Sequence, residues 1–191
     1  MFMKPLWVAI FVGVCVLKGP LHAATVRIEQ IDFDRVVTVH NTPLELYGVG
    51  LLRYRVVFRA YVGALYLGPE ASADEVWSGK TPMRLELEYF WPIRGEDFGE
   101  AAAPFLKDNL SPEEYKRIAE RAAQLGGLYR DVEPGDRYAL TFIPGRGTEL
   151  ALNGAPLGMI EGDDFASSYF RIWLGEKPID KRFRDQLLTP R

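Results

Sequence analysis

One short apolar segment, residues 51–67, holds the side chains best able to bind an anion. Arg53, Arg55, Arg59 and Tyr61 all occupy odd positions there, and on one continuous strand alternate side chains point to the same face. A guanidinium presents paired donors that match a carboxylate or a phenolate, and a phenol adds one more donor. The segment therefore indicates either an anion-binding face or an ordinary solvated face of a strand.

The other residues that might carry chemistry have simpler structural explanations. His40 lies in a sequence typical of a turn between strands, so we interpret it as a solvated turn residue and not as a catalytic base. Gly48 and Gly50 lack the third glycine of a dinucleotide-binding loop and are expected to bend or bulge a strand. Asp163 or Asp164 is expected to cap a helix instead of holding a cation. The sequence therefore predicts no metal site and no cofactor.

The N-terminus predicts export. Lys4 precedes an apolar run over residues 6–17, which is shorter than the roughly 20 residues needed to span a bilayer but suits a signal peptide. Ala23 offers the small residue that signal peptidase requires. We therefore expect residues 1–23 to be a cleavable signal peptide and residues 24–191 to form a single domain. The mature protein would be periplasmic or secreted, with no integral membrane span.

Cleavage also changes the chemistry that is available. Cys15 is the only cysteine and would leave with the signal, so no disulfide or thiol nucleophile is expected in the mature chain. The full chain carries 23 basic and 26 acidic residues, and losing Lys4 and Lys18 takes its net charge from −3 to −5. Such a surface is not expected to attract DNA, RNA or anionic lipid by charge.

The periodicity of the mature chain predicts an α+β domain with an antiparallel sheet. Ser111 and Pro112 are typical of a helix start, the glycines at 126 and 127 of a helix end, and Asn153-Gly154 of a hairpin turn. The expected elements are a strand meander over 26–67, a helical turn at 72–76, a strand at 83–91, helices at 98–110 and 111–126, strands at 136–143, 148–152 and 156–160, a helix at 163–174, and a last helix ending near 188.

Two blocks of the sequence resemble a known family. LYGVGLLR at 46–53 and YVGALYL at 61–67 are similar to the N-terminal hairpin of the chalcone isomerase-like superfamily, in its bacterial exported branch. FIPGRGT at 142–148 and IWLG at 172–175 agree with that branch in order and spacing, so the resemblance covers residues 26–188.

The resemblance implies an open-faced β-sandwich, in which a large antiparallel sheet packs against helices and a ligand cleft lies between them. Plant enzymes of this superfamily close a chalcone ring, whereas related plastid proteins bind fatty acids and receive the carboxylate with an arginine and a tyrosine. The family arginine falls on Arg53 and the tyrosine of the fatty-acid binders falls on Tyr61. Lys107 and Asn109 do not have the spacing of the enzyme residues, which argues against chalcone isomerase activity.

The distance between Arg53 and Tyr61 leaves the ligand contact open. On a straight strand the two residues would lie roughly 26 Å apart, too far to share one carboxylate. They need a chain reversal between them, and no Gly, Asn or Pro marks one. Arg55 and Arg59 therefore remain alternatives to Arg53.

Three functions follow as hypotheses. The first is a non-catalytic binder of a fatty acid or similar amphipathic carboxylate, with Arg53, Tyr61, Arg55, Arg59 and Tyr89 as candidate ligand-binding residues and a small amphipathic or aromatic molecule as partner. The second is a chalcone isomerase-type intramolecular lyase acting on a phenolic enone, which would need polar groups near Tyr89, Arg94 and Asn109 to converge with Arg53. The third is an envelope module whose helical face binds another protein.

Overall fold

The computed structural model describes residues 24–54 and 58–191. The expected signal peptide, residues 1–23, lies outside the described residues, and so does Arg55. Both expectations therefore remain predictions. Within the described ranges, no helix is both long enough and apolar enough to cross a membrane.

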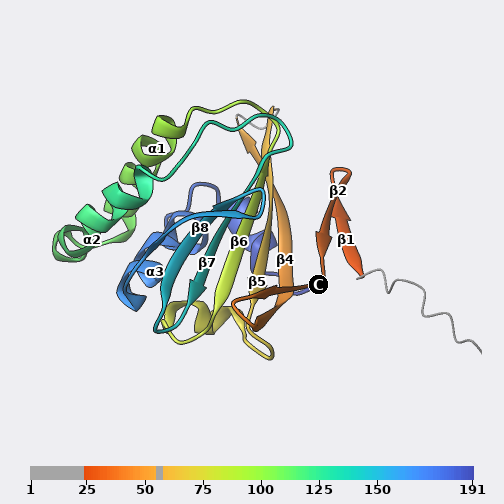
Figure 1. Ribbon diagram of the computed structural model, residues 1–191, viewed down its shortest axis with the longest axis horizontal. Coiled ribbons are helices and arrows are strands. Elements are labelled where there is room, and N and C mark those ends of the chain that lie inside the picture. The colour runs from red at the N-terminus through yellow and green to blue at the C-terminus, as the bar shows by residue number, and fades with distance from the viewer. Residues whose placement is uncertain (1–23, 55–57) are drawn as a thin grey trace, which may run out of the picture.

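A seven-stranded antiparallel sheet forms the centre of the molecule (Figure 1). Its order, β3-β4-β5-β6-β7-β8-β9, follows the chain, so every strand pairs with its neighbours in sequence. The β1-β2 hairpin forms a separate small sheet beside it. The strands are β1 Thr25–Ile28, β2 Ile31–Asp34, β3 Val36–Val39, β4 Thr42–Tyr54, β5 Phe58–Leu67, β6 Met83–Tyr89, β7 Arg137–Ile143, β8 Gly147–Leu152 and β9 Ala155–Ile160.

The two faces of the large sheet bury different sets of side chains. Along β5, Leu65 and Leu67 belong to the main core, whereas Val62 and Tyr66 belong to a smaller cluster on the other face. Because side chains alternate along a strand, one strand serves both clusters. The main core is closed by helical side chains and the smaller cluster by Phe33 of β2. This arrangement confirms the predicted α+β fold, a large antiparallel sheet packed against helices.

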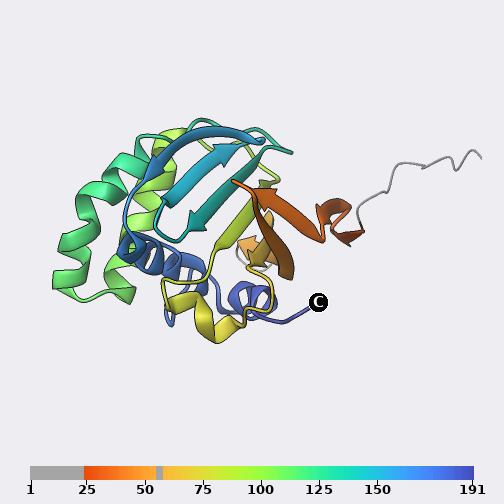
Figure 2. The ribbon, with the colours of Figure 1, turned by 60° about the horizontal axis from the view of Figure 1, so that its bottom comes forward.

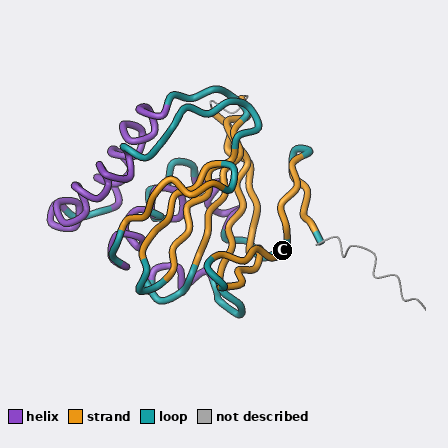
Figure 3. Tube along the Cα trace, viewed as in Figure 1, coloured by secondary structure: helices purple, strands orange, loops and turns teal. Residues whose placement is uncertain are grey.

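The helices gather on one side of the sheet, as Figures 2 and 3 show. Ser111 begins the second long helix as predicted, since its hydroxyl accepts from the Glu114 N–H at 3.2 Å while the Glu114 carboxylate accepts from the Ser111 N–H at 2.8 Å. Gly127 ends it. The helices are α1 Gly95–Asn109, α2 Pro112–Gly126, α3 Asp163–Tyr169, α4 Arg171–Leu174 and α5 Lys181–Leu187, with a 3-10 turn at Ala73–Trp77.

The predicted cap of α3 is wrong. Gly162 occupies the cap position with a φ of 101°, a left-handed value that glycine adopts easily. The Asp163 carboxylate instead accepts from the Gly145 N–H at 3.1 Å, and Asp164 accepts two hydrogen bonds from Arg121 at 2.8 and 2.7 Å. Both carboxylates join segments that are distant in sequence, which a local capping pattern does not reveal.

The last helix, α5, packs directly on β4. A side chain at Gly48 would collide with the carbonyl of Leu187, and one at Gly50 would come within 2.9 Å of the Phe183 ring. Tyr47 is left without a partner between two paired stretches of β4 and β5. The expectation that these glycines accompany a bulged strand is thus confirmed, and their second role is to admit a helix.

Candidate functional site

An apolar pocket of about 220 Å³ lies between the helix-covered face of the sheet and helices α1 and α4. The strands β5 and β6 contribute one wall, and α1, the segment after α2, and the C-terminal helices contribute the others. Six of its thirteen lining residues are aromatic: Tyr61, Tyr89, Phe98, Tyr129, Tyr169 and Trp173.

The rings hold one another in fixed orientations. Tyr61 meets Tyr89 edge to face with centroids 5.4 Å apart, and Tyr89 meets Phe98 in the same way at 5.5 Å. Phe98 stacks on Tyr129 at 4.7 Å. Edge-to-face and offset-stacked pairs are the favoured aromatic geometries, so the wall is a packed and preorganised surface.

Four tyrosines line the pocket, and two of them, Tyr61 and Tyr89, come from the sheet. The Trp173 indole N–H donates to the Tyr61 hydroxyl at 3.2 Å, which leaves the Tyr61 O–H free to donate in turn. The Tyr89 hydroxyl has no hydrogen-bond partner among residues 24–54 and 58–191. Burial raises the pKa of both phenols well above their ordinary value, so both are protonated donors at neutral pH.

The only charged residue in the described part of the lining is Asp97, on the first turn of α1. Arg94 donates to both of its carboxylate oxygens, at 3.2 and 2.7 Å. This pair is exposed, with 41% of the Asp97 side chain and 67% of the Arg94 side chain accessible. The charge therefore lies at the rim of the pocket.

The expectation that Arg53, Arg59 and Tyr61 share one face is wrong. The chain reverses between β4 and β5, and Arg53 pairs with Arg59 while Leu52 pairs with Tyr61. Ala60 is the extra residue of a bulge, and a shift of one residue sends the side chains on either side of it to opposite faces. The reversal that the sequence left unmarked thus exists, but it does not bring Arg53 to Tyr61.

Both arginines lie on the face away from the pocket, where they meet one carboxylate. The Glu29 side chain accepts from Arg59 at 2.9 Å and lies 3.6 Å from the Arg53 guanidinium. Arg59 also covers the Phe90 ring at 4.9 Å. Of the candidate ligand-binding residues, the structure brings Tyr61 and Tyr89 together and separates Arg53 and Arg59 from them.

The polar groups that an isomerase site would need do not converge. Asn109 binds the main chain of Lys177 through both its amide nitrogen, at 2.6 Å, and its oxygen, at 3.0 Å. Arg94 is held by Asp97 at the rim, and Arg53 lies on the other face of the sheet. Only Tyr89 of this set lines the pocket.

A wider and more polar cleft, of about 560 Å³, opens elsewhere, near the end of α1 and along α5. Its basic residues Arg171, Lys177 and Arg184 are matched by three acidic ones, Asp108, Glu176 and Asp185. Both guanidinium groups donate to main-chain carbonyls, and Arg184 also binds Asp185. The cleft thus offers no excess charge and no apolar wall comparable with that of the aromatic pocket.

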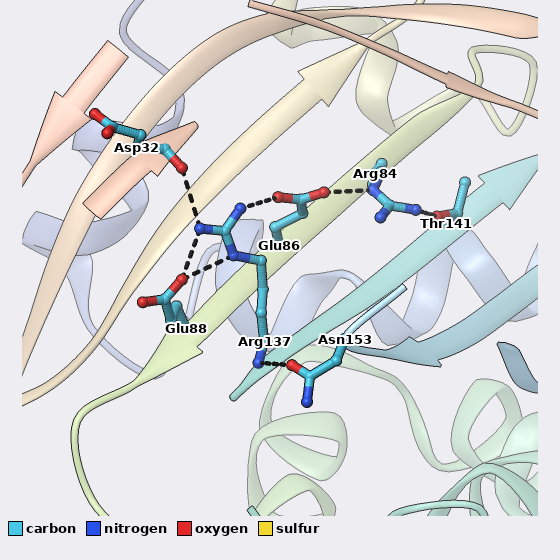
Figure 4. Close-up of polar contacts among 7 residues, drawn as sticks. All are labelled: Asp32, Arg84, Glu86, Glu88, Arg137, Thr141 and Asn153. Atoms are coloured by element: carbon cyan, nitrogen blue, oxygen red, sulfur yellow. Dashed lines mark hydrogen bonds and ion pairs between the residues drawn. The ribbon is translucent and has the colours of Figure 1, made fainter. Parts of the chain in front are cut away.

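Charged groups are instead concentrated on the face of the sheet opposite the pocket (Figure 4). Arg137 donates to Glu88 at 2.6 and 2.9 Å and to Glu86 at 3.1 Å, and Arg84 binds Glu86 from the other side at 2.8 Å. The Arg137 guanidinium also lies 4.4 Å from the centre of the Phe33 ring. These ion pairs satisfy one another and fasten β6, β7 and the β1-β2 hairpin together.

Sequence reasoning missed most of the pocket. It placed Phe98, Tyr169 and Trp173 within predicted helices but did not identify them as members of one cavity. Trp173 and Tyr61 are separated by 112 residues, so no local pattern joins them. One feature of the sequence did point to such a pocket. Aromatic residues make up 13% of the chain, and aromatic side chains are typical of the lining of an apolar cleft.

A family model described as chalcone isomerase-like matches residues 25–189. Among solved structures, the fatty-acid binding protein AtFAP1 of Arabidopsis thaliana is similar, with a TM-score of 0.66 and 17% sequence identity over 86% of this chain and 96% of that one. At this identity the likeness shows a shared fold. No curated protein sequence gives a significant match.

Proposed function

This chain belongs to the chalcone isomerase-like family, and from that premise we propose that it binds a small amphipathic ligand, such as a fatty acid, in the aromatic pocket and does not transform it. We further propose that it does so after export, in the periplasm or outside the cell. The plant protein with the same fold is described as a fatty-acid binding protein, which supports a ligand of this class.

The observation that carries this proposal is the chemistry of the pocket wall. Ligand pockets are mostly apolar, with a few polar groups that fix orientation, and here a lining rich in aromatic and aliphatic residues includes the phenols of Tyr61 and Tyr89. The Tyr89 residue is 4% exposed, and its hydroxyl is not one of the fully buried polar atoms that lack a partner. The hydroxyl can therefore donate to a ligand that enters the pocket.

The size of the pocket favours a small ligand. A volume of about 220 Å³ lies below the 300–1,000 Å³ usual for pockets that enclose drug-sized molecules. A short acyl chain or a single substituted ring fits such a space better than a long lipid. We therefore choose eight-carbon probes for the tests below.

Binding is favoured over isomerisation because the polar groups needed for ring closure lie apart. A phenolate attack on an enone requires a held anion and a stabilised enolate. Arg53 and Arg59, the candidate arginines that the structure describes, contact Glu29 on the far face of the sheet. Without a cation beside them, the phenols of Tyr61 and Tyr89 can bind a ligand by hydrogen bonds.

A substitution that blocks the pocket tests the proposal. Ala101 is exposed on α1 and lines the pocket, so Ala101→Trp should occlude it without disturbing the core, and Ala123→Trp, at an exposed alanine on α2 outside the pocket, is the matched control. Native mass spectrometry and lipid extraction of protein purified from the exporting compartment would be followed by calorimetric titration with octanoate and methyl octanoate. We expect the unmodified and Ala123→Trp proteins to bind and the Ala101→Trp protein to lose at least about tenfold in affinity. An absence of co-purified acyl compounds, together with no binding of either probe, would overturn the proposal.

A further inference from the structure

The interior of the aromatic pocket is uncharged among the residues that the structure describes. Its one charged lining residue, Asp97, lies at the rim and is already bound by Arg94. Arg53 and Arg59, which the sequence offered as ligand contacts, lie on the opposite face of the sheet and both contact Glu29. A ligand that enters the pocket thus meets aromatic rings and phenols.

The phenols can recognise a neutral acceptor. Tyr61 accepts from Trp173, which fixes its oxygen and leaves its own proton to donate, and Tyr89 has a proton without an acceptor among the described residues. The two rings are in contact, with centroids 5.4 Å apart. Because Tyr61 and Tyr89 pair across β5 and β6 and both line the pocket, one ligand can contact both phenols.

We propose that the pocket selects ligands whose buried end is an uncharged hydrogen-bond acceptor, such as the carbonyl of an ester or a ketone, over ligands that present a carboxylate. This inference rests on the proposed function and narrows its ligand class. It departs from the arginine-and-tyrosine carboxylate site that the sequence suggested, because the arginine is on the other face.

The physical reason is the cost of removing an ion from water. An ionised carboxylate loses its hydration on burial. Only a paired cation or several strong hydrogen-bond donors offset the free energy lost. Two neutral phenols offset a small part of that loss. A carbonyl oxygen loses much less on burial, and the same two donors satisfy both of its lone pairs.

The ionisation of the ligand provides a direct test. Calorimetric titration of the mature protein with octanoate and with methyl octanoate would be made at pH 8 and at pH 5.5. At pH 8 we expect the ester to bind at least about tenfold more tightly than the acid. A fatty carboxyl group titrates near the ordinary range of carboxylic acids, so its neutral fraction rises as the pH falls, and the affinity for octanoate should rise by more than about tenfold between pH 8 and pH 5.5.

The ester serves as the control for the protein itself. The titratable groups that face the pocket are Asp97, which is paired with Arg94, and the buried tyrosines Tyr61, Tyr89, Tyr129 and Tyr169. Any change in these groups would alter the affinity for methyl octanoate as well. A constant ester affinity beside a rising acid affinity therefore assigns the effect to the ligand.

Phenylalanine variants test the donors separately. Tyr61→Phe and Tyr89→Phe keep the rings and remove the hydroxyls, so each should lower the affinity for methyl octanoate by about fivefold to tenfold. Tyr66→Phe is the matched control, because Tyr66 lies on the same strand as Tyr61 with its side chain in the cluster on the other face. It should leave the affinity unchanged.

Two results would overturn the inference. Octanoate binding as tightly as the ester at pH 8, with no change at pH 5.5, would show that the pocket accepts a carboxylate and would leave the proposed function standing. If neither probe bound at either pH, the proposed function would fail together with this selectivity.

Discussion

Arg53 and Tyr61 point to opposite faces of the sheet, although they lie on adjoining strands of one hairpin. Leu52 pairs with Tyr61, so strand alternation turns Arg53 to the other face, and the unpaired Ala60 turns Arg59, the partner of Arg53, to that face as well. Alternation on β4 and one extra residue on β5 together separate the two arginines from Tyr61. The ligand chemistry of the pocket depends on that separation.

Arg53→Ala should leave ligand affinity within about twofold of the unmodified protein, since its guanidinium lies across the sheet from the pocket and beside Glu29. Titration with methyl octanoate measures this. Arg59→Ala provides a second variant on the same face and should behave alike. A tenfold loss in either variant would place an arginine at the ligand and contradict the geometry described above.

Tyr66→Phe should leave the free energy of unfolding unchanged or raise it by up to about 1 kcal/mol. The Tyr66 hydroxyl is buried without a hydrogen-bond partner in the described residues, so removing it costs nothing in bonding and relieves a desolvated group. Urea unfolding followed by circular dichroism gives the value.

Tyr138→Phe is the contrasting case. Its hydroxyl accepts from the Arg130 N–H at 2.7 Å and donates to the Arg130 carbonyl at 2.8 Å. The substitution leaves both main-chain groups without that partner, and it should cost about 1–3 kcal/mol. If the Tyr66 and Tyr138 variants had equal free energies of unfolding in the same urea experiment, the predicted difference in hydrogen bonding between the two hydroxyls would be contradicted.

Arg137→Met should destabilise the domain by about 3 kcal/mol. The substitution keeps much of the volume but leaves the Glu86 and Glu88 carboxylates without their shared cation in a site where their side chains are only 7% and 15% exposed. The control is Arg27→Met, whose guanidinium pairs with Asp32 at the surface and whose loss should not be measurable. A small effect for Arg137 would mean that solvent screens this network.

The stability of the domain should fall as the pH rises above about 10. Burial raises the pKa of Tyr61, Tyr89 and Tyr129, and that of Tyr169 to about 12, relative to the value of about 10 in an unfolded chain. The unfolded state therefore releases these protons first, so the stabilisation is complete below pH 10 and is lost as the pH rises through the folded values. Urea titrations between pH 8 and pH 11, with absorbance at 295 nm as a second probe, would show both effects. Ionisation of all tyrosines at pH 10 in the folded protein would contradict the burial.

The sequence predicts those elements whose ends have a local cause. Ser111 begins α2 because its capping hydroxyl acts within one helical turn, and the helix ends at the predicted pair of glycines. The turn at Asn153-Gly154 follows equally from two residues with positive φ values of 50° and 80°. The fold class could be predicted because it is the sum of such local signals.

The candidate site could be predicted only in part, for a different physical reason. Tyr61 and Tyr89 were candidates, and they meet because β5 and β6 pair in register. The bulge at Ala60 has no residue signature, since alanine fits an ordinary strand as well as it fits a bulge. The remaining wall depends on contacts between segments such as Tyr61 and Trp173, which only tertiary packing creates.

The packing of α5 on β4 also determines when the domain can become stable. The Leu51 N–H donates to the Gln186 side chain at 2.9 Å across 135 residues of sequence, and Phe183 is fully buried against the strands. Contacts of such long separation form late, because the chain between them must first be ordered. A polypeptide emerging from a ribosome or a translocation channel cannot complete this core until α5 is free. The segments that precede α5 therefore stay incompletely packed until then, which is compatible with the export that we propose.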